Sequence, residues 1–270
     1  MGSAQEATDW PGLTHDPADG GLGFNFKWNM GWMHDFLEYM KLDPYFRKYN
    51  HNKMTFGLTY ASSENFILVL SHDEVVHLKC SMITKMPGIY EDKFANLKVG
   101  YTFMMTHPGK KLLFMGQDFG QFHEWDEKVS LDWHLTGEPL HADLQRYYSD
   151  LLHVYRKYPA LHRLEKDWHG FQWINANDGD RSIFSYIRRD ETGKKSLLVI
   201  CNFTPMERSD YRVGVPKRGN YTLVMDTAHG LYKRGEHAPA FRSVKKECDG
   251  QPYSFAYPLP PYGAAIFRFS

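Results

Sequence analysis

Three ionisable residues follow directly on an apolar run in the stretch FILVLSHDEVVH, residues 66–77. The first six residues of this stretch include one polar side chain, which is typical of a strand buried on both faces. Removing a charge from water is costly unless the charge is paired or put to use. His72, Asp73 and Glu74 therefore either cap buried structure or line a reaction site.

The spacing around this stretch does not match a metal or nucleotide site. His72 and His77 lie five positions apart at a strand end, whereas the zinc-protease motif needs two histidines four positions apart on a helix. The stretch GGLGF at 20–24 lacks the spacing of a dinucleotide-binding loop, and PGKK at 108–111 is not a phosphate-binding loop. We expect neither a metal nor an organic cofactor.

Polar residues also follow the two neighbouring strands that the sequence predicts. The carboxyl ends of parallel strands meet at one edge, and in α/β barrels function collects on the loops at that edge. One polar strand end has the simple interpretation of a helix cap, but three such ends together favour a functional site. The groups at these three ends are Lys27, Trp28 and Asn29, then His72, Asp73 and Glu74, and finally Gln117, Asp118 and Gln121.

Strand and helix patterns alternate through the first 160 residues and then change. Continuous apolar strands that alternate with amphipathic helices predict a parallel α/β arrangement. After Trp168, short strand-like runs separated by turn-rich segments predict an antiparallel β-sandwich. We expect a first domain at 1–165 and a second at 166–270. The expected strands are 21–28, 66–71, 110–116, 182–189, 195–203, 220–226 and 264–270, and the expected helices are 29–42, 93–106 and 140–158.

Composition narrows the class of partner and the location. Lys plus Arg equal Asp plus Glu at 32 each, so no net positive charge would attract nucleic acid. A signal peptide and an apolar stretch of membrane-spanning length are both missing, so we expect no membrane association. Cys80, Cys201 and Cys248 are odd in number and widely spaced, which favours a reducing, cytoplasmic location. The opening Met1-Gly2-Ser3 resembles an added leader or a truncation scar.

Several longer stretches carry a resemblance to a known family. They are ATDWPG (7–12), GGLGFNFKWNMGWMHD (20–35), ENFILVLSHDEVVH (64–77), KFANLKVGYTFMMTHPGKKLLFMG (93–116), SLDWHL (130–135) and NFTP (202–205). Along nearly its whole length from Ala4, the chain resembles the 1,4-α-glucan (glycogen) branching enzymes of the α-amylase superfamily. This resemblance implies a partial (β/α)8 barrel, strands 6 to 8, followed by an antiparallel β-sandwich.

The resemblance also implies a reaction. Such enzymes cleave an α-1,4 link through a covalent glycosyl intermediate, using a carboxylate nucleophile and a carboxylic acid, and transfer the chain to a 6-hydroxyl. Asp73 takes the role of a third carboxylate that stabilises the transition state, and His72 contacts the same sugar ring. Lys27, Trp28 and Gln121 are candidates for sugar contact. The implied partners are an α-glucan and the N-terminal half of the same enzyme.

The chain departs from the family pattern in ways that affect its chemistry. The nucleophile stretch, similar to GFRxDAV, is absent. Gln5 stands at the position of the family's acid with Glu6 beside it, Leu78 replaces a glycine, and Asp118 replaces a usual glutamate. We therefore expect the isolated segment to be inactive. Two alternatives stay open, an amylase-like glucan hydrolase and a non-catalytic glucan-binding protein, and Gln5 favours the second for the chain as it stands.

Overall fold

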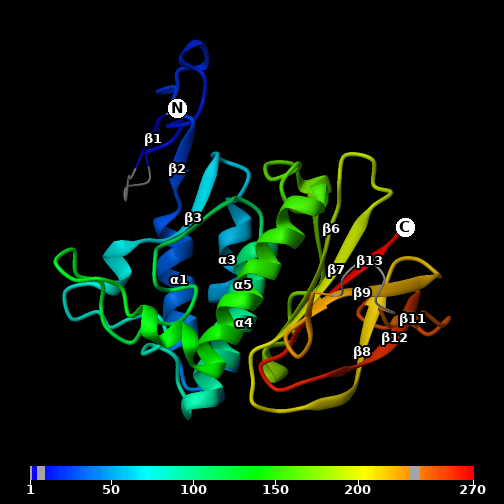
Figure 1. The fold of residues 1–270 in the computed structure, drawn as a ribbon. Helices are drawn as coiled ribbons and strands as arrows, with labels where there is room; N and C mark the ends of the chain where they lie inside the picture. Colours follow the sequence, from blue (N-terminus) through cyan, green and yellow to red (C-terminus); the bar gives the residue numbers. More distant parts are fainter. Residues whose placement is uncertain (1, 5–9, 232–237) are drawn as a thin grey trace.

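A parallel sheet forms the first half of the protein. The computed structural model describes residues 2–4, 10–231 and 238–270 (Figure 1). Four parallel strands lie in the order β1-β2-β3-β4, and this confirms the parallel arrangement of the three strands predicted here. The short β1 was not predicted. The strands are β1 Ser3–Ala4, β2 Phe26–Trp28, β3 Phe66–Leu70 and β4 Lys110–Leu113.

Three long helices confirm the helical predictions. They are α1 Met30–Lys41, α4 Tyr90–Thr106 and α5 Pro139–Lys157. Asn29 begins α1 because its side-chain oxygen accepts a hydrogen bond from the Trp32 amide at 2.9 Å. In the part of the chain that the structure describes, no helix has the length and hydropathy to cross a membrane. The shorter helices are α2 Pro44–Arg47, α3 Asn52–Phe56, η1 Pro17–Asp19, η2 Lys48–Asn50, η3 Gly57–Thr59, η4 His72–Val75, η5 Trp133–Gly137, η6 Pro159–Leu161, η7 Trp168–Gly170 and η8 Gly179–Arg181.

Antiparallel strands form the second half. A seven-stranded sheet has the order β10-β9-β13-β7-β6-β5 with β11 added on β9, and β8 pairs with β12 in a second sheet. Apolar side chains of both sheets, such as Leu198, Val213 and Phe255, share one core, as expected of a sandwich. The strands are β5 Phe171–Asn175, β6 Ile183–Arg188, β7 Ser196–Asn202, β8 Arg208–Val215, β9 Asn220–Asp226, β10 Gly230–Leu231, β11 Ala240–Arg242, β12 Tyr253–Leu259 and β13 Ala264–Phe269.

The seven-stranded sheet has a second apolar face, which packs against α4 and α5. Figure 1 shows these helices between the parallel sheet and the antiparallel strands. Phe103 of α4 lies edge-on to Phe184 of β6, with ring centroids 5.6 Å apart. The hydroxyls of Thr106 and Tyr186 are hydrogen-bonded at 2.6 Å across the same contact. The division at 165/166 stays a prediction, since one core extends across it.

Two buried arginines connect the halves through backbone carbonyls. Arg47 donates to the carbonyl of Phe203 at 2.7 Å and to that of Met40 at 2.8 Å. Arg188 donates to the carbonyls of Thr106 and Gly170. Burial lowers the pKa of Arg47. Burial also lowers the pKa of Arg188 to about 10, so this side chain stays charged at neutral pH.

His107, at the end of α4, should make the protein less stable in mild acid. Its ring is buried and donates through Nδ1 to the carbonyl of Pro108 at 3.0 Å. Burial lowers the pKa of His107 to about 3, from an ordinary value of 6.5. Between these values the unfolded chain binds a proton that the folded chain does not. The unfolding free energy should therefore decrease by about 1.4 kcal/mol for each pH unit below 6.5.

Denaturant unfolding at pH 7 and pH 5 measures this effect. The variant His107→Asn, which does not titrate in this range, should lose less stability between the two pH values than the unsubstituted chain. His153 on α5 is exposed, so His153→Asn serves as the control and should keep the original pH dependence. An equal pH dependence of the unfolding free energy in all three proteins would contradict the assignment of this effect to His107.

Candidate functional site

The three ionisable residues after β3 have different structural roles. Ser71 begins η4, and the carboxylate of Glu74 accepts hydrogen bonds from the Ser71 amide at 2.9 Å and hydroxyl at 2.7 Å. This reciprocal cap satisfies backbone groups at the strand end and explains why Glu74 is buried. The side chain of Asp73 is 38 % exposed instead. Of the two carboxylates, Asp73 is therefore the one accessible to a ligand.

Asp73 lies beside the imidazole of His72, which in turn lies near two aromatic rings. Nε2 of His72 is 3.2 Å from Oδ1 of Asp73, and the imidazole is 44 % exposed. The ring centroids of Phe114 and Trp125 lie 5.8 Å and 6.1 Å from that of His72. A carboxylate and an imidazole provide hydrogen bonds, while aromatic rings provide flat apolar faces. This combination suits a ligand with both hydroxyl groups and apolar faces, such as a sugar ring.

Glu124 holds the loop that follows Asp73. His77, Leu78 and Cys80 have positive φ angles of 54°, 65° and 67°, a region that residues other than glycine rarely adopt. The carboxylate of Glu124 accepts hydrogen bonds from the Leu78 amide at 3.0 Å and from the Cys80 amide at 2.6 Å. These bonds fix the strained backbone and connect the loop after β3 to the loop after β4.

Lys85 stabilises the same turn from the buried side. Its Nζ donates to the carbonyls of Glu74 at 2.6 Å, Lys79 at 2.5 Å and Cys80. Burial lowers the pKa of Lys85 to about 8, so the ammonium group persists at neutral pH. The turn that carries Asp73 is thus held on one side by a buried cation and on the other by Glu124.

Leu78→Gly should stabilise the protein. Leu78 is 95 % exposed at φ 65°, so its side chain contributes little packing while its backbone is strained. Glycine adopts this conformation without the steric cost, and the unfolding free energy should rise by about 0.5–1 kcal/mol. Thermal unfolding measures the change. Leu22→Gly is the control, since Leu22 is also exposed but is not among the positive-φ residues; a similar gain there would contradict the explanation.

Two predicted sugar-contact residues lie on β2. Lys27 is buried, and its Nζ donates to the carbonyl of Trp10 at 3.1 Å, which holds the N-terminal loop against the sheet. Trp28, the last residue of β2, is partly buried and pairs with Ile67 of β3. Their proposed contact with sugar stays a prediction.

The loop after β4 contains the third predicted residue. Gln121 is buried; its side chain donates to the carbonyl of His123 at 3.2 Å and accepts from the amide of Asp132 at 2.9 Å. These bonds fold the loop on itself, so Gln121 has a structural role whatever else it contacts. Gln117 donates from Nε2 to the carbonyls of Leu70 and Ser71 and thereby connects this loop to β3.

The remaining residues singled out from the sequence are Gln5, Glu6 and Asp118. Gln5 and Glu6 follow β1 directly but lie outside the described residues. Asp118 accepts a hydrogen bond from Gln145 of α5 at 3.1 Å and so faces that helix. The structure therefore brings together His72 and Asp73 with residues that the sequence did not indicate, namely Lys85, Phe114, Glu124 and Trp125.

Within the described ranges, one group of side chains has metal-ligand spacing. His34, Asp35 and Glu38 lie close together on the outside of α1. The carboxylate of Glu38 already accepts a hydrogen bond from Lys53 at 2.5 Å and contacts His34 at 3.1 Å. This group is on α1, not among the loops at the strand ends that carry Asp73, and its carboxylate has a cation partner. It gives no reason to assign a metal to the candidate site.

Comparisons with known proteins cover nearly the whole chain. Residues 173–270 match the family described as alpha amylase, C-terminal all-beta domain. The chain is 56 % identical to the 1,4-alpha-glucan branching enzyme GlgB of Butyrivibrio fibrisolvens over 98 % of its own length and 42 % of that protein. It is 50 % identical to the protein of the same name from Aquifex aeolicus, with the same coverage of each chain. The chain spans about two fifths of the length of these relatives.

Solved structures of lower identity support the fold. An alpha-amylase from H. orenii matches 100 % of this chain and 53 % of its own at a TM-score of 0.62 and 14 % identity. A type I pullulanase from Bacillus subtilis matches 100 % of this chain and 40 % of its own at a TM-score of 0.67 and 14 % identity. At this identity the comparison shows the fold alone, and that fold includes the all-β second half.

Proposed function

Because the chain belongs to the family of 1,4-α-glucan branching enzymes and spans about two fifths of these relatives, we propose that it is a catalytic segment of such an enzyme. The reaction is cleavage of an α-1,4 link and transfer of the released glucan chain to a 6-hydroxyl. The high identity over 98 % of the chain carries this proposal. Three free cysteines support a reducing, cytoplasmic location.

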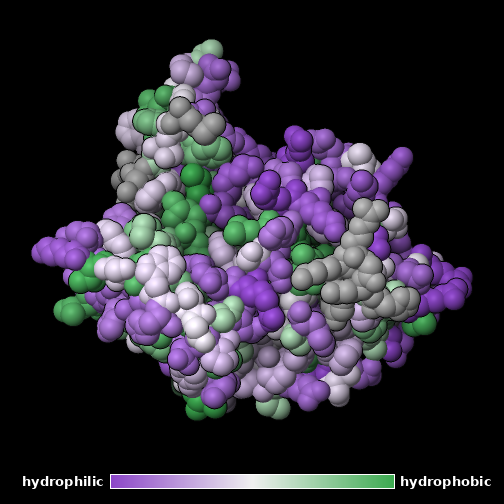
Figure 2. All heavy atoms as spheres, viewed as in Figure 1, coloured by the Kyte–Doolittle hydropathy of each residue, from purple (hydrophilic) through white to green (hydrophobic). Residues whose placement is uncertain are grey.

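The four parallel strands fit one side of a (β/α)8 barrel. In this proposal β2, β3 and β4 are strands 6 to 8, and β1 is the strand before them. An eight-stranded barrel of this kind needs about 250 residues, so the other strands must come from the N-terminal half of the enzyme. Exposed apolar side chains next to the parallel sheet support such a partner (Figure 2). They are Trp10, Leu22, Phe24 and Met115.

Asp73 would then stabilise the sugar cation that develops during a retaining transfer. His72 would hydrogen-bond the same sugar, and Phe114 and Trp125 would limit where its ring can lie. Lys27, Trp28 and Gln121 would contact or shape neighbouring sugar positions. The nucleophile would come from the N-terminal half, and Gln5 would occupy the position of the acid.

A hybrid enzyme tests this proposal. In the hybrid, this chain replaces the matching segment of the Butyrivibrio fibrisolvens relative. The 270-residue chain alone should form no α-1,6 links, because it lacks the nucleophile. The hybrid should become active when Gln5→Glu restores a proton donor, with a gain of about 100-fold or more over the Gln5 hybrid. Glu6→Gln, added to the active hybrid, is the control and should retain activity.

Debranching of the product followed by chain-length analysis measures new α-1,6 links, and a reducing-sugar assay measures hydrolysis. Release of reducing ends without α-1,6 links would favour the amylase-like alternative. Branch formation by the chain alone, or equal activity of the Gln5 and Gln5→Glu hybrids, would contradict the proposal.

A further inference from the structure

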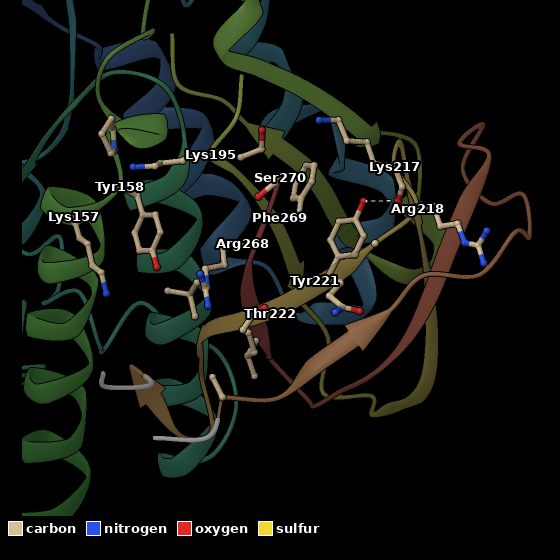
Figure 3. Close-up of a pocket in the computed structure, with 17 residues that line it drawn as sticks. Lys157, Tyr158, Lys195, Lys217, Arg218, Tyr221, Thr222, Arg268, Phe269 and Ser270 are labelled. Carbon is tan, nitrogen blue, oxygen red and sulfur yellow. Dashed lines mark hydrogen bonds between the residues drawn. The ribbon is translucent and has the colours of Figure 1, made fainter. Parts of the chain in front are cut away.

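A large cavity lies in the antiparallel half, built from none of the residues around Asp73 (Figure 3). Its volume is about 1050 Å³. The walls come from the end of α5, the start of β7, the turn between β8 and β9, β9 itself and the end of β13. Small-molecule pockets typically enclose about 300–1,000 Å³, so this cavity is large enough for a ligand of several functional groups.

Basic side chains dominate the charge of this cavity. Its walls include Lys157, Lys195, Lys217, Arg218 and Arg268, and no described aspartate or glutamate lines them. Over the whole chain, basic and acidic side chains are equal in number, so the excess of positive charge is local to this cavity. None of these five side chains forms an ion pair with a described residue. An anion bound here would reduce the repulsion among the cations.

Three of the lining residues form a compact group. Nζ of Lys157 lies 5.6 Å from the ring centroid of Tyr158. Burial raises the pKa of Tyr158, and the positive charge of Arg268 opposes that rise. Figure 3 shows Lys157, Tyr158 and Arg268 directed toward a common space at the α5 side, whereas Arg218 points away from them.

The two tyrosines of the cavity wall differ in exposure. The ring of Tyr221 is buried against Phe255 and Phe269, and its hydroxyl donates to the carbonyl of Lys217 at 3.0 Å, so it stabilises the wall. Tyr158 is only partly buried and is the ring that a ligand can reach. Tyrosine rings provide apolar faces and a hydroxyl, which suits the alternating apolar and polar surfaces of a sugar. Arginine binds phosphate with two parallel N–H groups, and lysine adds a point charge.

We propose that this cavity binds a sugar phosphate, with the phosphate held by Arg268 and Lys157 and the sugar ring against Tyr158. A free phosphate ion would fill only a small part of the space, and a neutral sugar would leave the cations without a partner. The ligand would be separate from the glucan at Asp73, so the site does not depend on the proposed transfer reaction.

Isothermal titration of the 270-residue chain at low salt tests the proposal with glucose 6-phosphate, inorganic phosphate and glucose. Glucose 6-phosphate should bind saturably with a Kd about tenfold below that of inorganic phosphate, and glucose should give no saturable signal in the same range. Arg268→Gln should raise the Kd of both phosphates about tenfold. Tyr158→Leu should raise the Kd of glucose 6-phosphate but leave that of inorganic phosphate unchanged.

Lys245→Gln is the matched control, because Lys245 is an exposed base of the same half that does not line the cavity; its Kd values should match those of the unsubstituted chain. Thermal unfolding of each variant verifies that it folds, and Lys157→Gln, at an exposed site that also holds the phosphate in this proposal, replaces Arg268→Gln if that variant unfolds. Equal Kd values for both phosphates would overturn the sugar contact. Binding that is absent, or unchanged in the cavity variants, would overturn the site.

Discussion

Asp73→Asn in the Gln5→Glu hybrid enzyme should lower the rate of α-1,6 link formation by about 100- to 1,000-fold. The reason is the loss of a negative charge beside the sugar cation that develops in the transition state. The melting temperature should change by only a few degrees, because the cap of η4 is formed by Ser71 and Glu74 and the Asp73 side chain is 38 % exposed. The iodine or debranching assay gives the rate, and a thermal scan gives the stability.

Glu74→Gln is the matched control for this prediction. It changes the adjacent carboxylate, which accepts two hydrogen bonds from Ser71 and is buried. This variant should lose about 1–3 kcal/mol of unfolding free energy, because a buried charge-assisted interaction is weakened. Near-normal branching by the Asp73→Asn hybrid would refute the role of Asp73. A loss of unfolding free energy in Asp73→Asn as large as that in Glu74→Gln would also refute it.

Arg47→Met should lower the unfolding free energy of the chain by about 2–4 kcal/mol. Arg47 is fully buried, and its two terminal nitrogens donate to carbonyls on different parts of the fold. Methionine fills part of the space but leaves the carbonyls of Met40 and Phe203 without these donors. Relief from burying the guanidinium offsets part of that cost. For a chain of this size the melting temperature should fall by about 5–15 °C.

Arg47→Lys distinguishes geometry from charge. Lysine keeps the positive charge but has one terminal nitrogen, so it should also destabilise the protein. Arg156→Met is the control, because Arg156 is exposed on α5, and it should leave the melting temperature nearly unchanged. A melting temperature for Arg47→Met equal to that of Arg156→Met would show that the two carbonyl contacts contribute nothing to stability.

The elements with a strong hydrophobic period could be predicted from the sequence. The apolar runs of β3, β6, β7, β9 and β13 and the helical periods of α1, α4 and α5 indicated these elements. The strands β8 and β12 were missed for physical reasons. β8 lacks a regular alternation, since Ser209 and Asp210 are both exposed while residues 213–215 are all buried. β12 contains Pro258, which argues against a strand. The two-residue β1 carries no pattern at all.

The candidate site was predictable only where a motif carries it. The stretch around Asp73 gave the position of the carboxylate, but the side chains that hold its turn gave no signal. Glu124 binds the amide of Leu78 from 46 positions away, and Lys85 binds backbone carbonyls that every residue possesses. Contacts of a side chain with the backbone leave the partner's residue type unconstrained, so they leave no trace in a single sequence.

The contact between the seven-stranded sheet and the helices α4 and α5 determines where this protein could recombine with a relative. A crossover just before β5 would combine the helices of one parent with the sheet of the other. Pairs such as Phe103 with Phe184 and Thr106 with Tyr186 would then come from different ancestors. A crossover before α4 keeps both sides of the interface from one parent. The segment that should be inherited from one parent therefore runs from α4 to β13. It is longer than the all-β region at residues 173–270, which does not include the two helices.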